Sequence, residues 1–177
     1  MKNRSQKLLE FLERSGPSLY ALLTRLTLRE DVAENLMQEL FIKLNSSKAF
    51  DKAKYPVAYA HRAAANLAFD WRKKHKRESL SLVDVREPAS NNSSPLSRLA
   101  QKEELEEILN AIGRLSGISR ETFVMRYIRQ NSYEQIAQAL GKDRHHVRVL
   151  CFRAMTRLRG LLERDKSQSS RKDVCDV

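Results

Sequence analysis

Arginine and histidine side chains gather on one segment of this chain, and their types and spacing suit contact with nucleic acid. The segment from Ser132 to Arg159 reads SYEQIAQALGKDRHHVRVLCFRAMTRLR. Its polar residues cluster where a recognition helix would present base-reading side chains, and further arginines follow where they could hold phosphates. The exposed positions expected on this surface are Arg144, His145, His146, Arg148, Arg153, Arg157 and Arg159.

Two helices and a tight turn must position these side chains. Ser132 with Gln135 three residues later predicts a capping box, so a helix should begin there. Gly141 can adopt the left-handed conformation that ends a helix, and Asp143 can cap the next one. The second helix has an apolar face at three- and four-residue spacing: Val147, Leu150, Cys151, Ala154, Leu158 and Leu161. The pattern predicts a helix-turn-helix.

A solvated basic face on an ordinary helical hairpin is the alternative interpretation of this segment. The clustering of polar residues at the front of the second helix favours DNA binding over that alternative. The formal net charge of +11 over 177 residues also suits a polyanionic partner, such as nucleic acid or an acidic membrane surface.

Composition excludes several other classes of protein. No apolar run approaches the roughly 20 residues that span a bilayer, so no membrane insertion is expected. The N-terminal stretch MKNRSQKLLEFLERSG does not resemble a secretory signal, because acidic residues interrupt its apolar pattern. Cys151 on a predicted buried face and Cys175 in the tail make neither a disulfide framework nor a metal site. We therefore expect a cytoplasmic protein.

The predicted fold class is all-α, in two small helical domains joined by a flexible linker, the second of them containing the helix-turn-helix. Five glycines and four prolines leave little turn chemistry for sheets, and helical periodicity covers most of the chain. The linker composition of 78–100 includes two prolines and a Ser/Asn run. The expected divisions are a first module at 1–77, a linker at 78–100, a second module at 101–164 and a disordered tail at 165–177.

The first module should contain four helices. They are predicted over about 5–14, 18–28 and 30–45, and from Pro56 onward. Gly16-Pro17 is expected to break the chain between the first two helices, and a polar loop should run from Ser46 to Lys54.

The fourth of these helices carries a second candidate nucleic-acid surface. Opposite a buried stripe, its side chains at three- and four-residue steps are Tyr59, Arg62, Asn66, Phe69 and Lys73. Aromatic rings interleaved with cations form a stacking and phosphate platform for single strands. The alternative is that Tyr59 and Phe69 belong to the core and that the terminal lysines favour the C-terminal end of the helix.

Together these segments resemble a bacterial RNA polymerase sigma factor of the extracytoplasmic-function, two-domain group. VAENLMQELFIKL resembles the family's polymerase-binding helix, and AYAHRAAANLAFDWRKKHKR resembles its −10 helix, including the spacing of Arg62, Asn66 and Asp70. SYEQIAQALGKDRHHVRVLCFRAMTRLR is similar to its −35 helix-turn-helix. The resemblance covers about 18–77 and 101–163.

The resemblance implies a role for each surface in promoter recognition and melting. The side chains implied to bind core RNA polymerase are Glu34, Asn35, Gln38 and Glu39. Those implied to hold the melted −10 strand are Lys54, Tyr55, Tyr59, Arg62, Asn66, Arg72 and Lys73. Those implied to meet the −35 groove and backbone are Arg144, His145, His146, Arg148, Val149, Arg153 and Arg157. The implied partners are core RNA polymerase and promoter DNA. An anti-sigma factor is a candidate partner that no residue here indicates.

Several positions depart from the family pattern. Asn35 stands where the family often has an acid, and Val32 stands where an aspartate is common. The pair His145-His146 replaces a frequent Gly-Thr, and Leu150 replaces a common arginine. The family's promoter sequence therefore cannot be transferred to this chain.

Other functions have less support in the sequence. No Gly-rich phosphate loop, paired Cys/His ligand spacing or Gly-x-Ser-x-Gly elbow is present, so we expect no catalytic residue, metal or cofactor. A helix-turn-helix regulator that never joins polymerase would leave the first module unexplained. A sigma-like scaffold that no longer melts promoters is a third possibility. Replacing Tyr59 and Arg62 with alanine separates the sigma factor from both.

Overall fold

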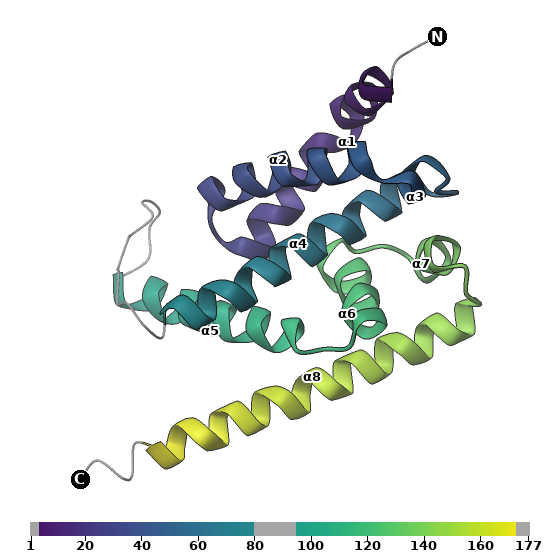
Figure 1. The fold of residues 1–177 in the computed structure, drawn as a ribbon. Coiled ribbons are helices and arrows are strands. Elements are labelled where there is room, and N and C mark those ends of the chain that lie inside the picture. The colour runs from purple at the N-terminus through teal and green to yellow at the C-terminus, as the bar shows by residue number, and fades with distance from the viewer. Residues whose placement is uncertain (1–3, 80–94, 173–177) are drawn as a thin grey trace.

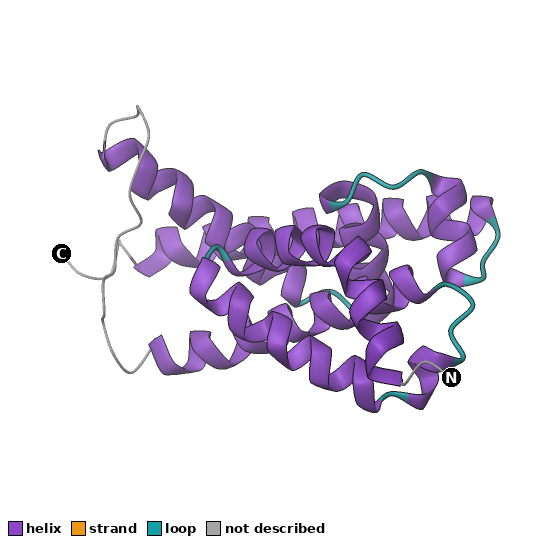
Figure 2. Cartoon of the chain, turned by 90° about the horizontal axis from the view of Figure 1, so that it is seen from above, coloured by secondary structure: helices purple, strands orange, loops and turns teal. Residues whose placement is uncertain are grey.

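The computed structural model describes residues 4–79 and 95–172, and every regular element in those ranges is a helix (Figures 1 and 2). The all-α prediction is confirmed. The order along the chain is α1 (Arg4–Thr27), α2 (Glu30–Ser46), α3 (Lys48–Asp51), α4 (Pro56–Ser79), α5 (Pro95–Gly113), α6 (Gly117–Phe123), η1 (Val124–Ile128), α7 (Tyr133–Leu140) and α8 (Arg144–Lys172).

Helices α1, α2 and α4 pack together around a leucine-rich core that forms the first module. The buried face of α2 contains Leu36, Leu40 and Leu44, as its periodicity predicts. Alanines of α4 face these leucines, and Ala60 and Ala64 are completely buried. Small residues on α4 allow the leucine-bearing helices to approach it closely. The loop that was predicted between α2 and α4 contains the single-turn helix α3.

Helix α1 continues through Gly16-Pro17, so the predicted break at this position is wrong. Pro17 is exposed, and its ring therefore lies on the side of α1 that packs against nothing. Leu8 before the proline and Leu19 after it are both buried in the same core. Burial on both sides stabilises one continuous helix, although an interior proline removes a backbone hydrogen bond.

The local signals for the helix-turn-helix are confirmed. The Ser132 Oγ accepts a hydrogen bond from the Gln135 backbone N–H at 3.2 Å, and the Gln135 Oε1 accepts one from the Ser132 N–H at 2.9 Å. Gly141 has φ +60° and ends α7 in the left-handed conformation. The Asp143 Oδ2 accepts from the His145 N–H at 2.7 Å and caps α8. All six residues of the predicted apolar face of α8 are buried.

The two modules pack against each other in this structure. Figure 1 shows α4 between α1 and α2 on one side and α5 and α6 on the other. One continuous apolar cluster includes leucines of α1 and α2, Phe69 of α4, Leu109 and Ile112 of α5, and Leu158 of α8. A smaller cluster around Ile136, Val147 and Cys151 holds the helix-turn-helix together.

Helices extend into both the expected linker and the expected tail. Most of the predicted linker 78–100 lies outside the described residues, but its last part, from Pro95, begins α5. Helix α8 continues to Lys172. The prediction of a disordered tail from residue 165 is therefore wrong for residues 165–172. No glycine or proline follows Gly160, and the Asp165 carboxylate pairs with Arg114 at 2.7 Å. Both features favour continuation of the helix.

Candidate nucleic-acid interface

The first part of α8 presents the surface that the sequence predicted for duplex DNA. The side chains of Arg144, His145, His146 and Arg148 are exposed, and Val149 is half-buried beside them. Farther along α8, Arg153 and Arg157 are also exposed. The buried face of α8 fixes this orientation, because it packs on α5, α6 and α7. Cations and hydrogen-bonding rings therefore project from one helix whose start is capped and rigidly held.

An ion pair connects the two helices of this motif. The Arg144 Nε lies 2.7 Å from the Glu134 Oε1, and both side chains are exposed. Hydrogen bonding to its own backbone N–H, together with the positive charge of Arg144, lowers the pKa of Glu134. Exposed pairs of this kind contribute little to stability, so Arg144 can exchange the carboxylate for a phosphate.

Phe152 is a candidate contact that the sequence analysis missed. Its side chain is 73% exposed, although the neighbouring Cys151 is buried. It lies one helical turn beyond Arg148, next to a shallow groove lined by Arg153 and Arg157. An aromatic residue that falls outside the buried period of a recognition helix is the signal that could have identified it. Apolar side chains at such positions can contact the methyl group of thymine.

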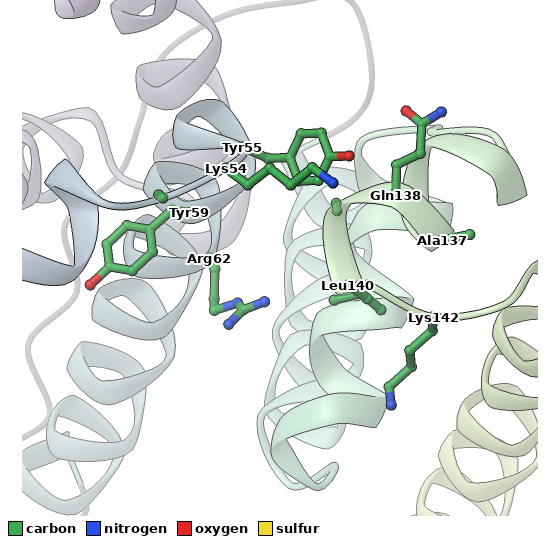
Figure 3. A pocket seen from close by; sticks show the side chains of 11 residues that line it. Lys54, Tyr55, Tyr59, Arg62, Ala137, Gln138, Leu140 and Lys142 are labelled. Atoms are coloured by element: carbon green, nitrogen blue, oxygen red, sulfur yellow. The ribbon is translucent and has the colours of Figure 1, made fainter.

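The second candidate surface borders a pocket of about 570 Å³ between the modules (Figure 3). Lys54, Tyr55, Tyr59 and Arg62 line it on the side of the first module. The opposite wall is the end of α7 and its turn, including Gln138 and Lys142 (Figure 3). The Tyr59 hydroxyl lies 3.0 Å from the Ser47 Oγ, which fixes its ring beside α3. Four of the seven predicted strand-binding residues are thus brought together.

The remaining predicted strand-binding residues are placed differently. Lys73 is exposed, whereas Asn66 is half-buried and its Oδ1 accepts a hydrogen bond from Arg120 at 3.1 Å. Arg72 is only 6% exposed. Its guanidinium forms an ion pair with Glu106 and donates to the Asn110 Oδ1 at 3.0 Å. In this arrangement the Arg72 side chain cannot reach a phosphate.

Phe69 belongs to the core, so its predicted place on an exposed stacking stripe is wrong. Its side chain is 3% exposed, and the Arg120 guanidinium lies 5.2 Å from the centre of the ring. A Cβ atom at Gly113 would lie 3.4 Å from the Phe69 ring, so the glycine allows α5 to approach closely. The alternative core interpretation of this aromatic residue is therefore the correct one.

His61 is buried in the seam between α1, α4 and η1. Its Nδ1 lies 2.8 Å from the Val57 carbonyl oxygen, and its Nε2 lies 3.2 Å from the Ser18 Oγ. Burial and the positive charge of Arg129 lower the pKa of His61 to about 4. The ring is consequently neutral at pH 7 and has a structural role in this seam.

The face of α2 that points away from the core carries the predicted polymerase contacts. Glu34, Asn35, Gln38 and Glu39 are all exposed there. Ile42 follows them on the same helix and is 67% exposed. Carboxylates and amides around an exposed apolar side chain provide acceptors for a basic partner and an apolar anchor.

Within the described residues, no group of His, Cys, Asp and Glu side chains could hold a metal ion. In the same ranges, no helix is long and apolar enough to cross a bilayer. The helical fold and its helix-turn-helix define a DNA-binding protein.

Comparisons with known proteins identify the family. Residues 11–78 match the model for Sigma-70 region 2, and residues 111–160 match the model for Sigma-70, region 4. The two matches occur in that order and together cover about two thirds of the chain. The chain belongs to the bacterial sigma factors of RNA polymerase and directs transcription initiation.

One curated relative is the ECF RNA polymerase sigma factor SigM of Bacillus subtilis (strain 168). It is 24% identical over 148 residues, which cover 82% of this chain and 89% of the relative. A similar solved structure is the sigma factor RpoE of Bartonella quintana in complex with the anti-sigma factor NepR. It is 22% identical, covers 89% of this chain and 98% of its own, and has a TM-score of 0.47. The two region matches together with the similarity to SigM identify the chain as a sigma factor of the extracytoplasmic-function group.

Proposed function

We propose that this sigma factor divides promoter recognition between the surfaces described above. Residues 1–77 form the module that binds core polymerase and the −10 element, and residues 101–164 form the module that binds the −35 element. The exposed start of α8 supports the second assignment, since base-reading and phosphate-holding side chains follow each other along one helix. The Lys54, Tyr55, Tyr59 and Arg62 cluster supports the first, because stacking rings and cations hold single strands.

Polymerase docking is assigned to the outer face of α2. Its acidic and amide side chains are exposed, and no described helix covers them. Glu34→Ala with Glu39→Ala should weaken binding to core polymerase while leaving duplex DNA binding unchanged. A matched control removes two exposed acids elsewhere, Glu13 on α1 and Glu163 on α8. Equal loss of polymerase binding in both pairs would remove the assignment.

Three further properties follow from the proposed role. The chain contributes binding and positioning and catalyses no reaction itself. It acts in the cytoplasm, where core polymerase and promoter DNA are found. An anti-sigma factor remains a candidate partner through the family resemblance alone.

The experiment that tests the proposal is in vitro transcription with core polymerase on a library of genomic fragments, with and without the chain. New start sites that share two upstream elements are expected, and they would define the promoter. A regulator that acts without polymerase is less favoured, because the region 2 match accounts for the first module. Duplex binding without any new start site would favour that regulator.

A further inference from the structure

Three residues assigned to the −10 strand are already bound by the second module. Arg62 forms an ion pair with Glu121 of α6, and Arg72 forms one with Glu106 of α5. Asn66 accepts a hydrogen bond from Arg120 of α6. All three lie on α4, and their partners are separated from them by at least 34 positions in the sequence. The contacts are therefore tertiary contacts between the modules.

The partners of the two arginines have the charge of a nucleic-acid backbone. The chain carries a net charge of +11, yet the middle of α5 contains four glutamates, at 103, 104, 106 and 107. Of these, Glu106 is half-buried and pairs with Arg72 of α4, where a cationic run begins, whereas Glu103, Glu104 and Glu107 are exposed. A carboxylate offers an arginine fork nearly the same geometry as a phosphate. Glu106 and Glu121 thus pair with the arginine guanidinium groups that are assigned to the phosphates of the DNA strand.

Glu106 and its neighbour Asn110 lie outside both matched family regions, which end at residue 78 and begin again at residue 111. The Arg72 contacts are consequently a property of this chain's connecting segment rather than of either region.

Two features favour replacement of the Arg62–Glu121 and Arg72–Glu106 ion pairs by contacts to a ligand. Burial raises the pKa of Glu121 more than the charge of Arg62 lowers it, so the carboxylate lies in a costly environment. The Arg72 Nε is buried without a hydrogen-bond partner among the protein atoms. A contact of this kind holds the modules together but can be replaced by a ligand that satisfies the same cations better.

The other two functional surfaces remain open in the same arrangement. The outer face of α2 is exposed, and so are the basic residues at the start of α8. Figure 1 shows these two helices on opposite sides of the molecule, with α4 between them. Among the three surfaces, the strand-binding one alone has side chains held between the modules, namely Arg62, Asn66 and Arg72.

We propose that α5 and α6 form an internal latch, in which Glu106 and Glu121 stand in for the −10 strand until polymerase and promoter displace them. The inference rests on the proposed role of α4 in strand binding. In the latched chain, polymerase can dock on α2 and duplex DNA can dock on α8. Binding of a single strand requires release of α4 from α5 and α6. The affinity of the free chain for a melted strand is therefore reduced by the fraction of molecules in which α4 is released.

The first test changes the charge of the latch. The latch variant is Glu106→Lys with Glu121→Lys, and the control variant is Glu107→Lys with Glu163→Lys, which reverses two exposed acids of the same module. Binding of the free chains to the labelled non-template strand of the mapped promoter is compared. The latch variant should bind about tenfold more tightly than the control variant. Equal affinity of the two variants would overturn the latch.

The second test holds the modules closed. Ala53 of the first module and Gln138 of α7 both line the pocket between the modules, and Ala53→Cys with Gln138→Cys places a thiol at each, in a chain with Cys175→Ser. Cys151 can stay, because it is 2% exposed and burial raises the pKa of its thiol. A short bifunctional methanethiosulfonate bridges the two thiols and is released by reductant. The bridged chain should still bind core polymerase but form no open complex until it is reduced.

An open complex formed equally well by the bridged and the reduced chain would overturn the latch. Bridging should also be less efficient when the latch variant is combined with the two cysteines, and this readout needs no DNA. Failure of the strand assignment itself would look different. Arg62→Ala would then leave open complexes unchanged, while bridging efficiency would still report whether Glu106 and Glu121 hold the modules together.

Discussion

In the proposed docking on the −35 element, exposed side chains near the start of α8 and those farther along it should face different parts of the duplex. Arg148 lies in the second turn of α8, where base edges are within reach, whereas Arg157 lies two turns beyond it. Both are exposed, so each can be truncated without disturbing the core. The two positions should therefore contribute differently to specificity.

Arg157→Ala should weaken binding to all duplex sequences by a similar factor and reduce the slope against log salt by about one. Arg148→Ala should instead reduce discrimination at one base pair of the −35 element, by roughly 1–3 kcal/mol. Binding to a panel of single-base promoter variants at several salt concentrations distinguishes the two effects. Identical uniform losses for both variants would contradict the assignment of Arg148 to base reading.

The buried His61 should make the stability of the chain depend on pH. Its pKa is lowered from 6.5 to about 4 in the folded chain, so the unfolded chain binds the proton more readily. The contribution of a depressed pKa is present above about pH 6.5 and is lost as pH falls toward 4. For this 3%-exposed side chain the loss between about pH 7.5 and about pH 5 should be about 2 kcal/mol.

Denaturant unfolding at the two pH values measures this effect. His61→Gln should remove the loss, whereas His146→Gln, at an exposed position, should preserve it. The burial-raised pKa of Glu121 acts in the opposite direction but is shared by both variants, so the difference between them isolates His61. An unchanged pH dependence in His61→Gln would show that another group causes it.

At the scale of helices, two glycines of the second module should respond oppositely to the same substitution. Gly141 ends α7 at φ +60°, where an alanine is strained. Gly160 lies inside α8, and a Cβ there would meet nothing within 4 Å. Gly141→Ala should destabilise the chain by about 1 kcal/mol, and Gly160→Ala should stabilise it by about 0.5–1 kcal/mol. Thermal and denaturant unfolding measure both changes. Changes of the same sign in the free energy of unfolding of the two variants would contradict this prediction.

The helices differ in how well the sequence predicted them. In α8, the capping aspartate and the apolar period predicted both the start of the helix and its buried face, because these signals are local. In α4, periodicity predicted the face that packs on α1 and α2 but placed Phe69 on the exposed stripe, and neither His61 nor Arg72 was predicted to be buried. All three are buried because contacts from distant parts of the chain cover further sides of α4. Local spacing contains no information about such contacts.

Helix α1 shows the reverse case, in which a strong local signal was overruled. Gly16-Pro17 predicted a break, yet leucines on both sides of the proline share one core. Burial of several leucines outweighs one missing backbone hydrogen bond. The energy that decides the outcome comes from tertiary packing, which a short sequence window cannot supply.

At the scale of the whole molecule, α4 connects every proposed activity. It packs on the helix assigned to polymerase, carries Tyr59 and Arg62 of the cluster assigned to the melted strand, and contacts α5 and α6, which lead to the helix-turn-helix. A sigma factor must bring all three together on one promoter. Docking of either module therefore has a direct structural route to the strand-binding face.

The assignment of strand melting to α4 is tested most directly by permanganate footprinting of unpaired thymines on the mapped promoter with core polymerase. The chain should produce reactive thymines at the −10 element. Arg62→Ala should abolish them while protection of the −35 element persists, whereas Arg14→Ala, at an exposed position on α1, should behave like the parent chain. Undiminished thymine reactivity with Arg62→Ala would contradict the assignment of strand melting to α4.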